Sequence, residues 1–106
     1  MSKITFTANG TDYCLEYTKR TVKMMEDKGF APSRILEAPM TYLPELFAGA
    51  FLAHHRFAKK ETIDEIYEAM GDKRELVNTL IEMYNEPISA LTEDADEGNA
   101  IAWTRA

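Results

Sequence analysis

Residues 40–57 constrain the fold more than any other segment, because on a helix they are apolar on nearly every side. One stripe follows the i, i+3, i+4, i+7 spacing of an amphipathic helix and contains Leu43, Leu46, Phe47, Ala50, His54 and Phe57. Ala48, Leu52 and Ala53 lie outside that stripe. Such a helix must be enclosed by its own domain or covered by a partner.

The start of this central helix carries the expected signals. Thr41 can act as the N-cap, and Pro44 is tolerated in the first turn, where backbone N–H groups lack intrahelical acceptors. Glu45 is favoured near the positive end of a helix. We therefore predict a helix over residues 41–58.

The N-terminal residues predict a β-hairpin over about residues 3–17. Its turn is Asn9-Gly10, a dipeptide typical of hairpins because both turn positions need positive φ. Apolar residues alternate with polar ones on both sides of the turn, at Ile4, Phe6, Ala8, Tyr13, Leu15 and Tyr17. Because an isolated hairpin is marginal, its apolar face must pack on a helix or on another subunit's sheet. Its open edges are also candidates for pairing with a partner's strand.

Start and stop signals predict three further helices, over residues 18–28, 62–70 and 73–92. Thr18 starts the first and Gly29 ends it. Thr62 and Asp72 each stand three residues before a glutamate, which predicts capping boxes for the other two. Pro87 lacks an N–H and clashes with the preceding turn, so we expect a break near residues 85–86. Residues 30–39 are a connector with room for one short turn.

These elements predict an α+β fold that is mostly α. An N-terminal β-hairpin is followed by four to five helices packed around the central apolar helix, in one globular domain over residues 1–92. Residues 93–98 are almost entirely acidic, which predicts a flexible C-terminal tail over residues 93–106.

Composition excludes several classes of protein. The chain has 12 Lys and Arg against 18 Asp and Glu, and its net charge of -6 would repel a phosphate backbone, so we expect no nucleic-acid binding. Cys14 is the only cysteine, which excludes an internal disulfide and fits a reducing cytoplasm. The N-terminus has no continuous apolar run, and charged residues interrupt the central helix. We therefore expect no signal peptide, no membrane span and an intracellular protein.

No set of residues predicts catalysis. His54 and His55 point about 100° apart on a helix, so the pair cannot hold one metal as an i, i+4 pair does. We expect His54 to be a core histidine bonded to backbone, with His55 on the flank of the helix. No nucleophile–base spacing, phosphate-binding loop or calcium-loop spacing is present. The sequence therefore predicts no enzyme, no cofactor and no metal.

The surplus of apolar helix predicts protein binding instead. The candidate protein-binding residues in the centre of the chain are Phe47, Phe51, Leu52 and His55. Trp103 follows the acidic run, where no local core is available. It is either part of a disordered end or a short linear anchor tethered by the acidic segment.

Four features together suggest a family. They are the hairpin, Met-Thr-Tyr-Leu-Pro-Glu-Leu-Phe-Ala-Gly-Ala-Phe at residues 40–51, Glu-Met-Tyr-Asn-Glu-Pro at residues 82–87, and the end that runs from Asp-Glu-Gly-Asn at residues 96–99 to Trp103. With these features the chain resembles the small tail assembly chaperone-like proteins of long-tailed, siphovirus-type bacteriophages and of prophages in Gram-positive bacteria. The resemblance covers nearly the whole chain and consists of packing and capping patterns.

This resemblance implies a function in the host bacterial cytoplasm. Proteins of that family coat the long, helix-rich tape measure protein, help to recruit tail tube subunits, and are absent from the finished virion. A longer product often arises by ribosomal frameshift near the C-terminus. The partners implied here are the tape measure protein and the tail tube protein, with a homo-oligomer possible and neither nucleic acid nor membrane expected.

Two other classes of function stay open at this stage. One is a structural head–tail connector or tail completion protein of the virion, and the other is a host-directed regulator whose acidic surface mimics DNA. The acids here lack evident phosphate-like spacing, which weighs against the regulator.

Overall fold

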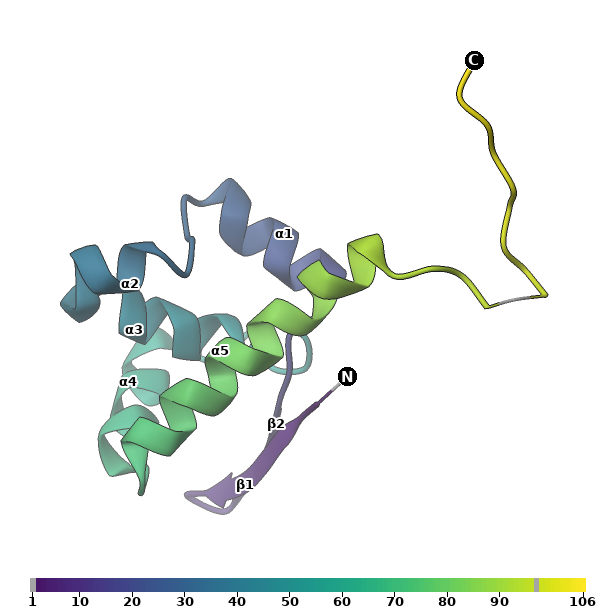
Figure 1. Ribbon diagram of the computed structural model, residues 1–106. Helices are drawn as coiled ribbons and strands as arrows, with labels where there is room; N and C mark the ends of the chain where they lie inside the picture. Colours follow the sequence, from purple (N-terminus) through teal and green to yellow (C-terminus); the bar gives the residue numbers. More distant parts are fainter. Residues whose placement is uncertain (1, 97) are drawn as a thin grey trace.

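The computed structural model describes residues 2–96 and 98–106 and places a small hairpin against a set of helices (Figure 1). The strands are β1 (Ile4–Ala8) and β2 (Thr11–Leu15). The helices are α1 (Lys19–Asp27), α2 (Arg34–Glu37), α3 (Pro39–Gly49), α4 (Lys60–Ala69), α5 (Lys73–Ser89) and the 3₁₀ turn η1 (Ala90–Thr92). This architecture confirms the prediction of an α+β fold that is mostly α.

The hairpin forms around the predicted turn. Asn9 and Gly10 both have positive φ, 52° and 78°, as the tight connection requires. The strands pair antiparallel from Ile4 opposite Leu15 to Ala8 opposite Thr11. The apolar face of the hairpin packs against the helices, with Leu15 fully buried.

The two edges of this sheet differ. The outer edge of β2 is covered, because the Glu16 N–H donates to the Ala50 carbonyl at 3.1 Å and the Cys14 N–H donates to Nε2 of His55 at 3.0 Å. Within the described residues, β1 forms no backbone hydrogen bond on its outer side. One edge is therefore covered and the other is open.

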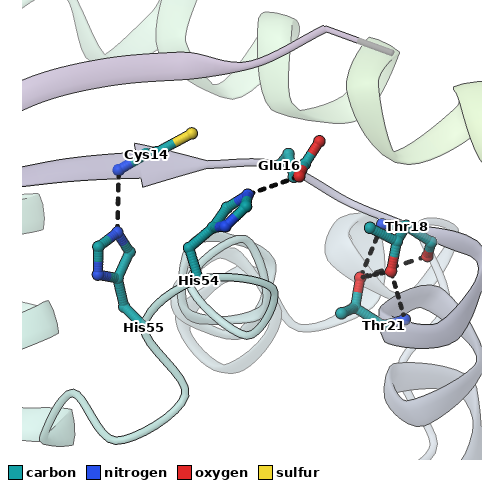
Figure 2. Close-up of polar contacts among 6 residues, drawn as sticks. All are labelled: Cys14, Glu16, Thr18, Thr21, His54 and His55. Atoms are coloured by element: carbon teal, nitrogen blue, oxygen red, sulfur yellow. Dashed lines mark hydrogen bonds and ion pairs between the residues drawn. The ribbon is translucent and has the colours of Figure 1, made fainter.

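Helix α1 begins as predicted. Thr18 is its N-cap, with its hydroxyl accepting from the Thr21 N–H at 3.1 Å, while the Thr21 hydroxyl accepts from the Thr18 N–H at 2.9 Å (Figure 2). Two donors that the helix leaves unpaired are thus satisfied reciprocally. After the helix, Gly29 adopts the positive φ of 91° that favours glycine.

The central helix is shorter than predicted. Helix α3 starts at Pro39, so Thr41 is not its cap, and it ends at Gly49 rather than near residue 58. Beyond Gly49 the chain continues as tight turns to about Phe57. Glycine weakens a helix, and the carbonyl of Ala50 is engaged by β2 instead of continuing the helical ladder.

The starts of the last two helices also differ from the predicted capping boxes. Helix α4 begins at Lys60, and its N-cap, Lys59, makes no side-chain hydrogen bond, so Thr62 lies inside the first turn. Asp72 is the N-cap of α5, but it has a left-handed backbone with φ of 49° and no side-chain cap bond. The extended conformation that aims a capping oxygen at the helix is absent there.

Helix α5 passes through Pro87 without the predicted break. It stays helical to Ser89 and continues into η1. The Pro87 side chain is fully buried, so packing offsets the missing backbone donor.

Aromatic rings hold the core together across distant segments. Tyr84 of α5 contacts both Tyr17 and Phe30, with ring centroids 5.4 and 5.3 Å apart. Phe51 contacts Phe47 at 5.1 Å and Tyr13 at 5.6 Å. The hairpin, α3 and α5 are therefore packed into one apolar cluster.

The C-terminal residues extend away from the helices (Figure 1). Residues 93–96 and 98–106 form neither helix nor strand and are exposed. In the described part of the chain, no helix is long and apolar enough to cross a membrane.

Candidate protein-binding surfaces

Two of the predicted binding residues lie in the core. Phe47 and Phe51 are each 1% exposed, so the structure corrects the expectation that these rings are available to a partner. The reason is the early end of α3: the turns after Gly49 bring Phe51 between Phe47 and Tyr13. Much of the apolar surplus read from the sequence is thus covered within the chain itself.

Leu52 is half-buried and lies beside a groove between α1 and α3. The groove has a volume of about 250 Å³ and is lined by Met25, Lys28, Phe30, Glu45, Ala48, Gly49 and Leu52. It depends on the close approach of the two helices at Gly49. A Cβ added there would lie 2.3 Å from Cε of Met25. Leu52 is therefore a predicted binding residue that the structure places on an accessible apolar surface.

The two histidines have exchanged their expected roles (Figure 2). His55 is half-buried, accepts the Cys14 N–H through Nε2, and packs its ring against Tyr13 at 5.0 Å. His54 is exposed, and its Nε2 lies 2.6 Å from Oε1 of Glu16. The sequence predicted that His54 would bond to the backbone, but His55 makes this bond. The prediction placed both residues on a helical wheel, which does not apply after Gly49. Since Nε2 of His55 accepts a hydrogen bond, it carries no proton in this arrangement.

A larger groove between α3 and α4 was not foreseen from the sequence. It has a volume of about 730 Å³, and its lining combines apolar residues with charged ones. The apolar part comprises Met40, Pro44, Phe47, Ala48 and Tyr67, and the charged part comprises Glu45, Lys60, Asp64 and Glu68.

Exposed apolar side chains mark one end of this α3–α4 groove. Met40 in its lining is 90% exposed, and Leu36 of the neighbouring helix α2 is 91% exposed. Leu36 lies in the segment that was interpreted from the sequence as a connector, and Met40 opens the segment interpreted as the central helix. Apolar and charged side chains therefore line the same groove.

The strongest electrostatic perturbations lie in the core rather than at a surface. Burial raises the pKa of Tyr17 well above its usual value, and the adjacent Tyr84 adds to this rise. Burial also raises the pKa of Tyr84, with a further contribution from Glu26. The Tyr17 hydroxyl donates to the carbonyl of Leu46, so this group serves the packing of α3.

Residues that could hold a metal do not gather in the described part of the chain. Among residues 2–96 and 98–106, no group of three or more His, Cys, Asp or Glu has the arrangement of a metal site. The two grooves described above are lined by apolar and charged side chains.

Trp103 lies in the C-terminal segment, which extends away from the helices (Figure 1). It is 83% exposed, and Ile101 beside it is 90% exposed. The structure therefore does not bring the five predicted residues together into one site.

The fold defines a small α+β protein that is mostly helical. The chain belongs to the DUF5055 family, described as a domain of unknown function, whose model matches residues 1–106. No curated protein and no solved structure matched the chain.

Proposed function

We propose that this protein is a phage tail assembly chaperone that binds the tape measure protein and helps to recruit tail tube subunits during tail morphogenesis. The observation that carries the proposal is the α3–α4 groove, which is lined by both apolar and charged residues and includes the nearly fully exposed Met40. The resemblance in residues 40–51 and 82–87 supports the same function from the sequence.

The chemistry of the groove suits a helix-rich partner. An amphipathic helix places apolar side chains at i, i+3 or i+4, and i+7 along one stripe, which can enter an apolar groove in series. Covering the side chain of Met40 alone would contribute about 1.5–3 kcal/mol. Lys60 and Asp64 on the rim offer charges of both signs to the polar flanks of such a helix.

The net charge of the chain fits a chaperoning role. A long tape measure protein exposes apolar stripes before the tail tube surrounds it, and a bound partner must cover them without aggregating. A chain of net charge -6 stays dispersed through self-repulsion while it contributes the groove. This action would take place in the host bacterial cytoplasm.

Co-expression with the tape measure protein of the same phage or prophage tests the proposal. The wild-type chain should keep the tape measure protein soluble and co-purify with it, whereas Met40→Asp should lose both effects. Leu91→Asp is the matched control, because Leu91 is 71% exposed and lies outside the α3–α4 groove. Full activity of Met40→Asp would exclude this groove as the site, and failure of the wild type would refute the function.

Mass spectrometry of purified particles separates this function from its main alternative. A chaperone should be missing from the finished virion. Detection of the chain at a stoichiometric level would instead identify a head–tail connector or tail completion protein.

A further inference from the structure

The α1–α3 groove adjoins a second hollow along α1. This second hollow has a volume of about 290 Å³ and is lined by Glu16, Thr18, Arg20, Thr21, Met24, Leu52, Ala53, His54 and Arg56. Leu52 lines both hollows, so they adjoin at this residue. We call the two hollows together the α1 strip.

The α1 strip has an ordered charge pattern. Arg20 and Arg56 lie in the second hollow, where the acidic Glu16 is already paired with His54. The middle and far parts are apolar, with Met24 and Leu52 followed by the Met25 and Phe30 region. The far hollow also contains Lys28 and Glu45, and the carboxylate of Glu45 has no hydrogen-bond or salt-bridge partner among the described residues.

The C-terminal segment has the complementary order. Residues 93–97 carry four carboxylates, Ile101 and Trp103 follow, and Arg105 comes last. The acids and the apolar residues of the tail thus correspond to the arginines and the apolar residues of the α1 strip, and Arg105 corresponds to Glu45 in a far hollow that also contains Lys28. In a chain of net charge -6, the arginines of this strip are a local exception that attracts such a tail.

The C-terminal segment is also long enough to cover the α1 strip. Arg20 and Lys28 are eight residues apart on and just after α1, a helical rise of about 12 Å. An extended chain from Asp96 to Trp103 spans up to about 23 Å. The tail can therefore place its acids near Arg20 while its indole reaches Met24 and Leu52.

We propose that the Ile101–Trp103 segment of one copy docks in the α1 strip of a second copy. The acids of residues 93–97 would lie against Arg20 and Arg56, Trp103 would pack on Met24 and Leu52, and Arg105 would reach Glu45. Methionine adapts to an inserted ring and makes favourable sulfur–aromatic contacts. Because each copy has one tail and one strip, two copies exchange tails in a closed two-fold dimer.

The direction of the tail favours a second copy as the owner of the strip. The C-terminal segment leaves the end of α5 and points away from the helices, so its apolar residues are presented outward (Figure 1). Ile101 and Trp103 are 90% and 83% exposed in the single chain.

Tryptophan fluorescence can test the docking directly, because Trp103 is the only tryptophan. Its emission should shift to shorter wavelength as the protein concentration rises, in step with the monomer-to-dimer transition measured by analytical ultracentrifugation. Trp103→Ala should weaken dimerisation at least about tenfold, as expected for an aromatic anchor at the centre of a contact.

Complementation identifies the strip. A chain with Arg20→Glu and Arg56→Glu keeps its tail but loses the basic strip, while Trp103→Ala keeps the strip but loses the anchor. Each variant alone should dimerise more weakly than the wild type. Their mixture can form one of the two docked contacts, so it should recover part of the dimer and part of the fluorescence shift. Lys3→Glu with Lys59→Glu is the control for the same change of net charge, because both lysines are exposed and outside the strip.

Three results would overturn the proposal. One is emission that stays at the position of exposed tryptophan at all concentrations. Another is a short-wavelength emission independent of concentration, which would place the tail on its own chain. The last is a mixture of the two variants that dimerises no more strongly than either variant alone. None of these readouts requires the tape measure protein, so the inference is tested independently of the proposed function.

Discussion

Tyr17 and Tyr84 contact each other in the core but differ in their hydrogen bonding, and this difference predicts opposite effects of the same substitution. Their ring centroids are 5.4 Å apart, and each side chain is 1% exposed. The Tyr17 hydroxyl donates to the Leu46 carbonyl at 2.5 Å. The Tyr84 hydroxyl is buried without a hydrogen-bond partner among the described residues.

Tyr17→Phe should destabilise the fold by about 1–3 kcal/mol. The carbonyl of Leu46 belongs to the last turn of α3, and its usual donor, the Ala50 N–H, is directed to Phe47 at 3.1 Å instead. Without the Tyr17 hydroxyl this acceptor loses its partner in a buried position. The ring itself is retained, so no cavity term is added.

Tyr84→Phe should be neutral or stabilise the fold by up to about 1 kcal/mol, because it removes a buried hydroxyl that forms no hydrogen bond. The two single variants should therefore differ by about 1–4 kcal/mol although they remove the same atom.

Urea denaturation followed by far-ultraviolet circular dichroism measures this difference, since Trp103 in the tail is a poor reporter of the core. Equal m-values for the wild type and both variants would show that only stability has changed. Equal losses in the two variants, or a larger loss for Tyr84→Phe, would refute the assignment of hydrogen bonds.

Three further predictions follow from the same structure. Because burial keeps the two tyrosines protonated in the folded chain while the unfolded chain ionises near pH 10, their contribution to stability is complete below pH 10 and is lost as the pH rises further. The fall should steepen above pH 10 as the unfolded chain ionises, and urea titrations between pH 9 and 11 should show a smaller fall for Tyr84→Phe. Gly49→Ala should cost about 1–3 kcal/mol through its clash with Met25, and a double-mutant cycle with Met25→Ala should show that cost to be largely relieved. His55→Ala should cost about 1 kcal/mol and speed hydrogen exchange at the Cys14 amide, and unchanged exchange there would contradict the hydrogen bond to His55.

Local signals were sufficient to predict the elements whose partners are close in sequence. The turn at Asn9-Gly10 and the cap at Thr18 depend on residues within a few positions, and both formed as expected. The end of α3 could not be read in this way. It depends on Glu16, directly after β2, whose N–H donates to the carbonyl of Ala50, 34 residues away along the chain.

The prediction of binding residues was limited for the same reason, because it also depends on contacts between residues far apart in the sequence. The burial of Phe51 and the exchanged roles of the histidines both follow from the end of α3 at Gly49. The α3–α4 groove exists only once α4 packs beside α3, so no local pattern around Met40 could reveal it. Leu52 and Trp103 were recognisable because apolar residues outside a stripe, or beyond the core, stand out without any knowledge of the fold.

The unequal edges of the hairpin have a consequence for assembly. An open β1 offers its backbone to one additional strand, while the turns around Ala50 and His55 leave no room for a strand beside β2. Two copies paired along β1 would form a four-stranded sheet whose two outer edges are both covered, so a third molecule could not add a strand. Strand addition would stop at four strands, and this limit prevents growth into a fibre.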